Sequence, residues 1–252
     1  MQDSIWYLKN CHLFSRLAPV DIAELESQAT VRIFNRGESV YLPNDQADAV
    51  LLVAKGRVKI FHVTPEGKQS ILDFVDTGEI FGELAIFGGD HRDEHVEATE
   101  KTKLVLIPKV ILQNVVQKYP DLALGVSKII GLRRQRLERR LRNLLFRSNR
   151  DRVIHLLLEL AEKYAEATPD GYLLNIRLSH QEMAAIIGST RETVTVVLGQ
   201  LQKEGRLSTA RRKIFVKDFA GLAHEVQTKV PTLPATARSA SLASFKLAHF
   251  AQ

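Results

Sequence analysis

The sequence is poor in cysteine, and it has no long uninterrupted run of apolar residues. Its 252 residues include one cysteine, Cys11, together with two methionines and one tryptophan. A single cysteine excludes an intramolecular disulfide, and by itself it cannot hold an iron–sulfur cluster or a structural zinc ion. The longest apolar stretches, such as 153–160, are interrupted by a polar residue and do not approach the about 18 apolar residues of a membrane span. We therefore expect no metal centre and no membrane segment.

The sequence also lacks the signals of export and of several enzyme classes. Its first residues have neither a basic region nor an apolar core of the kind that a signal peptide needs. The patterns Gly-x-Gly-x-x-Gly, His-Glu-x-x-His, Gly-x-Ser-x-Gly and the phosphate loop are absent. The sequence therefore predicts a cytoplasmic protein that is not an enzyme.

The charges that are present are divided unevenly along the chain. Overall, 45% hydrophobic and 25% charged residues are typical of a globular protein. Residues 1–110 hold 12 Lys/Arg and 17 Asp/Glu, net −5, whereas residues 111–252 hold 23 and 12, net +11. Two such halves indicate two domains, and a basic half favours a nucleic-acid partner, although ribosomal and membrane-surface proteins share this feature.

Short β-rich runs separated by glycines fill the region from residue 30 to residue 108. Strands with turn glycines at this spacing predict an antiparallel sandwich or barrel-like domain. The expected strands are 31–34, 49–53, 57–63, 70–75 and 103–107.

A helical, arginine-rich region follows Pro108 and extends to about Lys163. Nine arginines and two acidic residues lie between Arg133 and Arg152. Apolar residues at steps of seven, four and three form a thin seam that resembles that of a coiled coil. This pattern favours dimerisation over packing on the helix's own domain. The seam residues are Ile130, Leu137, Leu141 and Leu144.

Residues 179–205 predict two short helices joined at a glycine. Ser179 and Glu182 match a capping box, as do Ser189 and Glu192, and each box marks the start of a helix. Gly188 supplies the turn between the helices and Gly205 ends the second one. This arrangement favours a helix-turn-helix over an ordinary helical hairpin.

The first turn of the second helix carries side chains suited to reading bases. Arg191 can bond bidentately to guanine and Glu192 can accept from cytosine, unless Glu192 serves only the capping box. Residues 207–216 predict a wing of two strands around a basic turn that meets phosphates. The candidate base-reading residues are Arg191, Glu192, Thr193 and Thr195. The candidate phosphate contacts are Ser179, Ser189, Thr190, Arg211, Arg212 and Lys213.

Together these segments resemble the cyclic AMP receptor protein/FNR (CRP/FNR) superfamily of transcription regulators. The resemblance covers residues 10–218, and the order and spacing of its motifs are specific. The matching motifs are LFSRL at 13–17, RGES at 36–39, NDQAD at 44–48, KGRVKI at 55–60, FGELA at 81–85 and GSTRETVT at 188–195. The last of these also resembles the nitrogen-control branch, whose members sense 2-oxoglutarate.

The resemblance implies an α+β fold in which each part has a separate role. It implies a cyclic-nucleotide-binding-like β-roll at 1–110, a dimerisation helix at 111–146, a winged helix-turn-helix at 147–222 and a C-terminal tail at 223–252. The implied partners are double-stranded DNA, RNA polymerase and a second copy of the chain. At Val196, where many members have a second base-reading arginine, the resemblance implies looser reading of the DNA.

The effector pocket departs from the family pattern at both ends. Arg92 matches the arginine that binds the cyclic phosphate, but Asp93 replaces the following Ser or Thr. A carboxylate there adds repulsion of about 4 kcal/mol at 4 Å and an effective dielectric of 20. Leu137 and Glu138 replace the Thr-Ser pair that contacts adenine. The implied pocket residues are Gly82, Glu83, Leu84, Arg92, Asp93, Arg133, Leu137 and Glu138.

The sequence therefore predicts a homodimeric, sequence-specific DNA-binding transcription regulator that acts on a pseudo-palindromic site. We expect either a small-molecule effector other than cyclic AMP, of unidentified nature, or none. Two alternatives stay open at this point: a cyclic-AMP-responsive regulator and a non-specific architectural DNA-binding protein.

Overall fold

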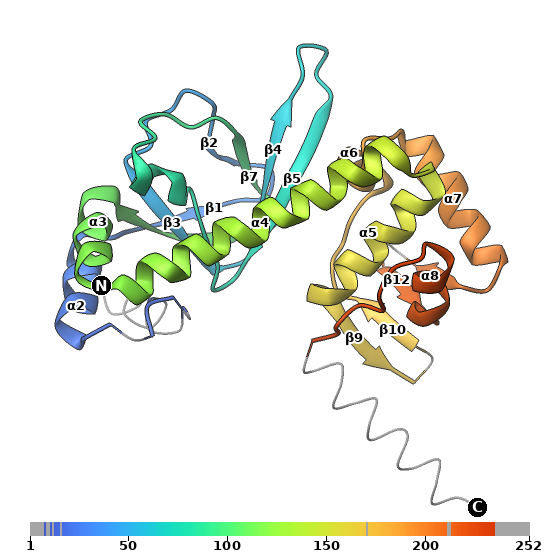
Figure 1. Ribbon diagram of the computed structural model, residues 1–252. Helices are drawn as coiled ribbons and strands as arrows, with labels where there is room; N and C mark the ends of the chain where they lie inside the picture. Colours follow the sequence, from blue (N-terminus) through green and yellow to red (C-terminus); the bar gives the residue numbers. More distant parts are fainter. Residues whose placement is uncertain are drawn as a thin grey trace, which may run out of the picture. The chain divides into compact units, whose positions relative to one another are not determined.

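The chain folds into two compact units, residues 1–137 and 138–252. Figure 1 shows the computed structural model, which describes residues 8, 11, 13–15, 17–169, 171–210 and 213–234. No helix within these ranges is long and apolar enough to cross a membrane. Both units combine helices with antiparallel sheets, which confirms the α+β fold class.

The first unit is a roll of two four-stranded antiparallel sheets. In spatial order, one sheet is β1 (Thr30–Phe34), β8 (Thr102–Pro108), β3 (Ala49–Lys55) and β6 (Ile80–Phe81). The other is β2 (Ser39–Tyr41), β7 (His95–Ala98), β4 (Arg57–Val63) and β5 (Gln69–Asp76). The five expected strands are confirmed, and the short strands β2, β6 and β7 are additions to them. A core of inward-facing residues such as Val53, Val58 and Val96 fills the roll.

Helices close one end of the roll and lead away from it. The helices α2 (Pro19–Gln28), α3 (Lys109–Lys118) and the first turns of α4 (Pro120–Phe146) share a second apolar core with β3 and β8. The carboxylate of Asp21 in α2 accepts a hydrogen bond of 2.7 Å from Lys118 and another from Tyr119. These bonds fix α2 against the end of α3.

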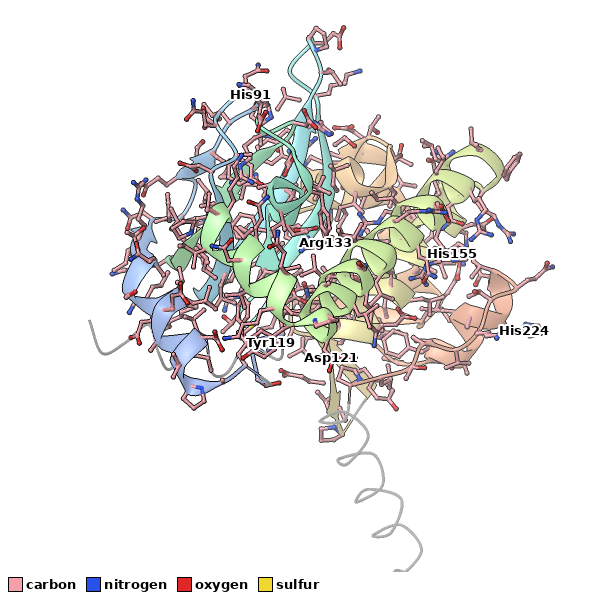
Figure 2. The ribbon with its side chains drawn as sticks, turned by 60° about the vertical axis from the view of Figure 1, so that its left-hand side comes forward. His91, Tyr119, Asp121, Arg133, His155 and His224 are labelled. Atoms are coloured by element: carbon pink, nitrogen blue, oxygen red, sulfur yellow. The ribbon has the colours of Figure 1, made fainter. Side chains whose placement is uncertain are left out.

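The segment expected as one helix over 111–146 is divided between α3 and α4. Tyr119 has extended backbone angles, φ −122° and ψ 92°, because a residue that precedes proline is disfavoured in the helical region. Pro120 then starts the next helix, where its missing N–H costs nothing. Figure 2 labels Tyr119 and Asp121 on either side of this junction.

The second unit contains a helix-turn-helix and a four-stranded sheet. Its helices after α4 are α5 (Asn149–Tyr164), α6 (His180–Ile187), α7 (Arg191–Lys203) and α8 (Phe219–Glu225). The sheet order is β11 (Leu207–Ala210), β12 (Lys213–Val216), β10 (Gly171–Leu174) and β9 (Ala165–Thr168). The expected wing strands are therefore confirmed as β11 and β12, next to two strands that the sequence analysis did not include.

Of the two capping boxes predicted for the helix-turn-helix, one is confirmed and the other is wrong. The capping box at Ser179 and Glu182 is confirmed, as is the left-handed Gly188 (φ 63°) that ends α6. The second expected capping box is wrong, because Thr190 rather than Ser189 caps α7 and accepts a hydrogen bond from the Thr193 amide. Ser189 instead donates to Asn149 Oδ1 at 3.1 Å, so it connects the turn to the start of α5.

Candidate functional site

The first turn of α7 is exposed, whereas the opposite face of the same helix is buried. Arg191 and Glu192 are exposed at its N-terminus. The buried side of α7 consists of Val194, Val197, Leu198 and Leu201. A helix that packs by one apolar face in this way presents its polar N-terminal turn to solvent, as a helix that enters a DNA groove must.

Two threonines of α7 use their polar groups within the chain. The Thr193 hydroxyl lies 3.0 Å from that of Thr190. The Thr195 hydroxyl donates to the Arg191 carbonyl at 2.9 Å and lies 2.7 Å from Nδ1 of His180. Both residues lie on the helix that the sequence analysis assigned to base reading, but that role stays a prediction for both of them.

An open groove joins the start of α7 to the wing. Its lining includes His180 at the start of α6, Arg191 on α7 and Thr209 and Lys213 on the wing strands. The structure thus brings the predicted base-reading Arg191 and the predicted phosphate contact Lys213 to one groove. Arg211 and Arg212, which lie between the two wing strands in the sequence, are outside the described residues. A basic groove of this kind suits the phosphate backbone of DNA.

The remaining predicted phosphate contacts also have partners within the chain. The Ser179 hydroxyl accepts from the Glu182 amide at 3.2 Å and lies 2.7 Å from Glu182 Oε2. Ser189 and Thr190 make the turn and cap contacts given above. Contacts of these three residues with phosphate therefore stay predictions.

Arg150 connects three helices of the second unit through two ion pairs. It lies in the first turn of α5 and donates to both carboxylate oxygens of Glu204, which follows α7, at 2.9 and 2.6 Å. Its Nε donates to Glu225 of α8 at 2.7 Å. Because one planar guanidinium joins both carboxylates, it fixes the end of α7 against α5 and α8.

A half-buried histidine lies on α5, the helix that precedes the helix-turn-helix. His155 of α5, labelled in Figure 2, lines a small cavity together with Arg140, Arg152 and Glu159. Its buried Nε2 has no hydrogen-bond partner among the described residues. Burial, followed by the charge of Arg147, lowers the pKa of His155 below its ordinary value of 6.5. The folded unit therefore favours the neutral ring.

In the roll, the arginine that the resemblance assigns to a cyclic phosphate, Arg92, is directed into the protein. Arg92 is 6% exposed and donates to the carbonyls of Gly82, at 3.2 Å, and Ala49. Its guanidinium lies 4.6 Å from the centre of the Tyr41 ring. Gly82 has φ 70°, and a Cβ there would lie 2.5 Å from Arg92 Nη1. The glycine is thus needed both for its backbone angle and for the room that it leaves to Arg92.

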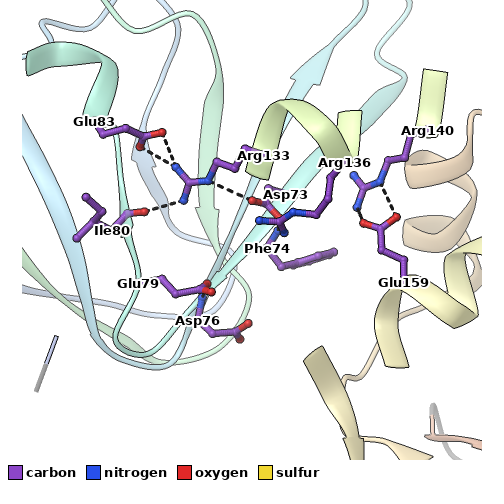
Figure 3. A network of polar contacts seen from close by, with 10 residues as sticks. All are labelled: Asp73, Phe74, Asp76, Glu79, Ile80, Glu83, Arg133, Arg136, Arg140 and Glu159. Atoms are coloured by element: carbon purple, nitrogen blue, oxygen red, sulfur yellow. Dashed lines mark hydrogen bonds and ion pairs between the residues drawn. The ribbon is translucent and has the colours of Figure 1, made fainter. Parts of the chain in front are cut away.

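Glu83, which the resemblance also places in the effector pocket, is neutralised by Arg133 of α4. Nη1 of Arg133 lies 2.6 and 2.7 Å from the two Glu83 oxygens, and Nη2 donates to the Ile80 carbonyl at 2.6 Å. Nε of Arg133 lies 3.3 Å from Asp73, which also pairs with Arg136 at 3.0 Å. Figure 3 shows this network, in which two arginines of α4 meet two carboxylates of the roll.

Burial and charge act in opposite directions on Arg133. Burial alone would lower its pKa, but the negative charges of Glu83 and Asp73 outweigh burial and raise the pKa above its ordinary value. The guanidinium therefore stays charged, and Glu83, only 5% exposed, has a permanent counter-charge. We name the four residues Asp73, Glu83, Arg133 and Arg136 the roll–helix ion network.

The other predicted pocket residues lie at the surface of their units. Leu84 and Asp93 of the first unit are exposed, as is Leu137 at its boundary. Glu138 is exposed in the second unit. Within the first unit the structure thus joins Glu83 with Arg133 and Gly82 with Arg92. Their role in binding an effector stays a prediction.

The sequence analysis missed several residues of the roll. Asp73 was not singled out, although a carboxylate inside the apolar run 70–75 is a signal that could have revealed it. Tyr41 was also missed. Its hydroxyl donates to Glu94 at 2.7 Å, and burial, followed by the Glu94 charge, raises the Tyr41 pKa well above its ordinary value.

Most of the predicted dimer seam is uncovered in the single chain. Leu137 is 41% exposed, Leu141 55% and Leu144 42%. Ile130 differs, because it packs partly against the apolar core of the first unit. The second half of α4 therefore presents apolar side chains to solvent, together with Leu145 and Phe146.

Two family models match the chain. A cyclic nucleotide-binding domain model matches residues 31–119, and a Crp-like helix-turn-helix domain model matches residues 151–225. The first covers most of the roll and α3. The second covers α5 to α8 with the sheet between them.

Relatives and solved structures match most of the chain. A global nitrogen regulator from Synechocystis sp. is 29% identical over 197 residues, 77% of this chain and 88% of that protein. A CRP-like cAMP-activated global transcriptional regulator from Mycobacterium tuberculosis is 25% identical over 87% of this chain and 98% of its own length. The structure of a CRP/FNR-family transcriptional regulator from Thermus thermophilus is 30% identical, with a TM-score of 0.63, and the match covers 79% of this chain and 99% of that one.

Proposed function

Since the chain belongs to the CRP/FNR family of DNA-binding transcription regulators, we propose that it acts as a homodimer on a pseudo-palindromic site and does not need cyclic AMP. The observation that carries the DNA half of this proposal is the exposed first turn of α7. Arg191 and Glu192 are accessible there while the helix is anchored by its buried apolar face. Arg191 then bonds to a guanine and Glu192 accepts from a cytosine.

The exposed leucines of α4 support the homodimer. Leu137, Leu141 and Leu144 follow the seven-residue repeat of a coiled-coil seam and are all more than 40% exposed. Burying such a stripe against a second copy removes apolar surface from water. A symmetric dimer then holds two copies of α7 for two half-sites, whose centres lie about 34–36 Å apart along the DNA.

The ion pairs of the roll support independence from cyclic AMP. Both oxygens of Glu83 are occupied by Arg133, and the Arg92 guanidinium is bonded to two carbonyls. Cyclic AMP would have to displace these contacts in order to reach the two groups that bind its ribose and phosphate in family members. Asp93 adds a like charge next to the phosphate position.

Selection of binding sequences from random duplex DNA tests the DNA half of the proposal. We expect the purified protein, with no effector added, to enrich a pseudo-palindrome. Binding of all sequences with one affinity would instead favour the architectural alternative. Enrichment that appears only after cyclic AMP is added would favour the cyclic-AMP-responsive alternative.

Thermal unfolding with added ligands tests the effector half. We expect no shift of the melting temperature with cyclic AMP at micromolar concentration, because the ligand groups are already paired. A cyclic AMP stabilisation of several degrees would contradict the proposal. Stabilisation by cyclic GMP, cyclic di-GMP or 2-oxoglutarate, tested in parallel, would identify an effector of another class.

The proposal includes the setting in which the family works. We infer a cytoplasmic protein that contacts RNA polymerase at the promoter, and we assign it no catalytic role.

A further inference from the structure

The second turn of α7 exposes an apolar side chain next to the polar first turn. Val196 is 58% exposed, whereas the other valines and leucines of the helix are at most 5% exposed. Its neighbours in sequence, Thr195 and Val197, are respectively exposed and buried. Val196 therefore lies beside the buried face of α7 rather than within it, and no packing in its own unit accounts for a branched apolar residue there.

Val196 lies on the same side of α7 as the predicted base-reading turn. Residues four apart on a helix are neighbours on one face, so Val196 follows Glu192 one turn later. Gly199 comes three residues after Val196 and continues this side. A Cβ added at Gly199 would have no atom within 4 Å, so the chain itself leaves room for any side chain at this position.

The absence of a side chain at Gly199 needs an explanation outside the chain. Glycine inside a helix is less favourable than alanine, and Gly199 is in the middle of α7. A bare helix surface lets another molecule approach the backbone closely. The bare surface at Gly199 lies one turn after Val196, farther along α7 from Arg191, which is the first residue of the helix.

The neighbouring threonine does not make this turn more polar. The Thr195 hydroxyl is already bonded to the Arg191 carbonyl and lies within 2.7 Å of His180. Between the exposed Glu192 and Gln200, one turn before and one turn after Val196, this side of α7 offers the Val196 methyl groups and the backbone at Gly199 as its accessible surface. It complements an apolar feature, in contrast to the charged turn before it.

We propose that Val196 is a specificity-determining residue that contacts the C5-methyl group of one thymine in each half-site. The inference rests on the proposed function, since it requires α7 to enter the major groove. Thymine is the one natural base with a methyl group in that groove, and apolar side chains recognise it. The basic groove lined by His180, Arg191 and Lys213 begins at the first turn of the same helix, which favours DNA over an apolar protein surface as the partner of α7.

Replacing single thymines by deoxyuridine in the selected binding site tests the contact. This exchange removes one methyl group and leaves the hydrogen bonds of the base pair unchanged. We expect one thymine in each half-site whose replacement weakens binding of the unmodified protein about four-fold, the effect of one buried methyl group. For Val196→Ala that loss should disappear, so the two changes together form a double-mutant cycle.

Val20→Ala is the matched control. Val20 is an exposed valine, 77% accessible, on α2 of the first unit, and its replacement should leave the four-fold effect intact. Circular dichroism of both variants verifies that the fold is kept, as expected for exposed residues.

The outcomes separate this inference from the function on which it rests. If no sequence is selected at all, the proposed function fails. If a site is selected but every deoxyuridine duplex binds equally well, the function stands and the Val196 contact is refuted. An equal loss for Val196→Ala on thymine and deoxyuridine duplexes would also refute it, because Val196 would then contact something other than the methyl group.

Discussion

The side chain of Arg133 neutralises Glu83, with its Nη1 atom 2.6 and 2.7 Å from the two carboxylate oxygens. Glu83 begins the short helix 83–87 that follows β6, whereas Arg133 lies in the middle of α4. This pair therefore joins the predicted effector pocket to the helix that carries the predicted dimer seam.

Replacing Arg133 by alanine should destabilise the first unit substantially. The change leaves Glu83, whose side chain is only 7% exposed, without its counter-charge, and it removes one of the two arginines that pair with Asp73, whose side chain is 15% exposed. Breaking a buried pair from one side costs about 3–5 kcal/mol. The free energy of unfolding, from urea denaturation followed by circular dichroism, measures the loss.

Arg139→Ala is the control for this change, because Arg139 is an exposed arginine of the same helix. Its replacement should alter the free energy of unfolding by no more than about 0.5 kcal/mol. Equal losses in the two variants would show that the ion network does not stabilise the roll.

Replacing Arg191 by alanine should reduce discrimination at one base pair. We expect a loss of about 1–3 kcal/mol on the selected site and little change on duplexes mutated at the contacted G·C pair. Titrations of both duplexes by fluorescence anisotropy give the difference. Uniform weakening on every sequence would contradict a base-reading role.

Lys213→Ala provides the contrasting variant. Lys213 lies in the same groove as Arg191, but we assign it to a phosphate. Its loss should weaken binding to all sequences alike and reduce the slope of log affinity against log salt by about 1. An effect that depends on the DNA sequence would indicate instead that Lys213 contacts a base.

Replacing Leu141 by glutamate should dissociate the dimer. Leu141 is 55% exposed in the single chain, so the change leaves the fold of each protomer intact but places two carboxylates in the predicted seam. Sedimentation velocity should show a dimer for the unmodified protein and a monomer for the variant. Leu124→Glu, at a position 69% exposed on α4 but outside the heptad seam, should remain dimeric. A monomeric unmodified protein would contradict the seam.

The stability of the second unit should fall as the pH is lowered through the range of histidine titration. Because the folded state holds the pKa of His155 below 6.5, the unfolded chain takes up a proton first when the pH falls. The contribution of the neutral His155 ring to the free energy of unfolding is thus complete above pH 6.5 and is lost at lower pH. Melting temperatures of the unmodified protein and His155→Gln between pH 7.5 and 5 should show a shallower decline for the variant. His224→Gln, at an exposed position of α8, should keep the original slope.

The periodic and capped parts of the fold could be predicted from the sequence because their causes are local. Ser179 and Glu182 are three residues apart and satisfy each other's backbone amides. The wing strands on either side of the basic turn likewise follow from alternation and turn residues. The wrong second cap has a local cause too: Ser189 and Thr190 are both good cap residues, and contact with Asn149 decides between them.

The ion network could not be predicted, because it depends on contacts between distant segments. Arg133 and Glu83 were each assigned to the pocket from the family resemblance, but nothing in their sequence neighbourhoods shows that they pair with each other. Asp73 joins them only through the position of β5 beside α4. The short strands β2 and β7 were missed for the same reason, since their pairing rather than their composition makes them strands.

Varying the distance between two half-sites tests the central claim most directly. The selected half-site is placed twice, in inverted orientation, in duplexes whose half-site centres are separated by 8 to 14 base pairs, and the affinity is measured for each. Our account predicts a sharp maximum where the centres are about 10–10.5 base pairs apart, one turn of the double helix. Affinity that does not depend on the separation, or that equals the affinity for a single half-site, would contradict it.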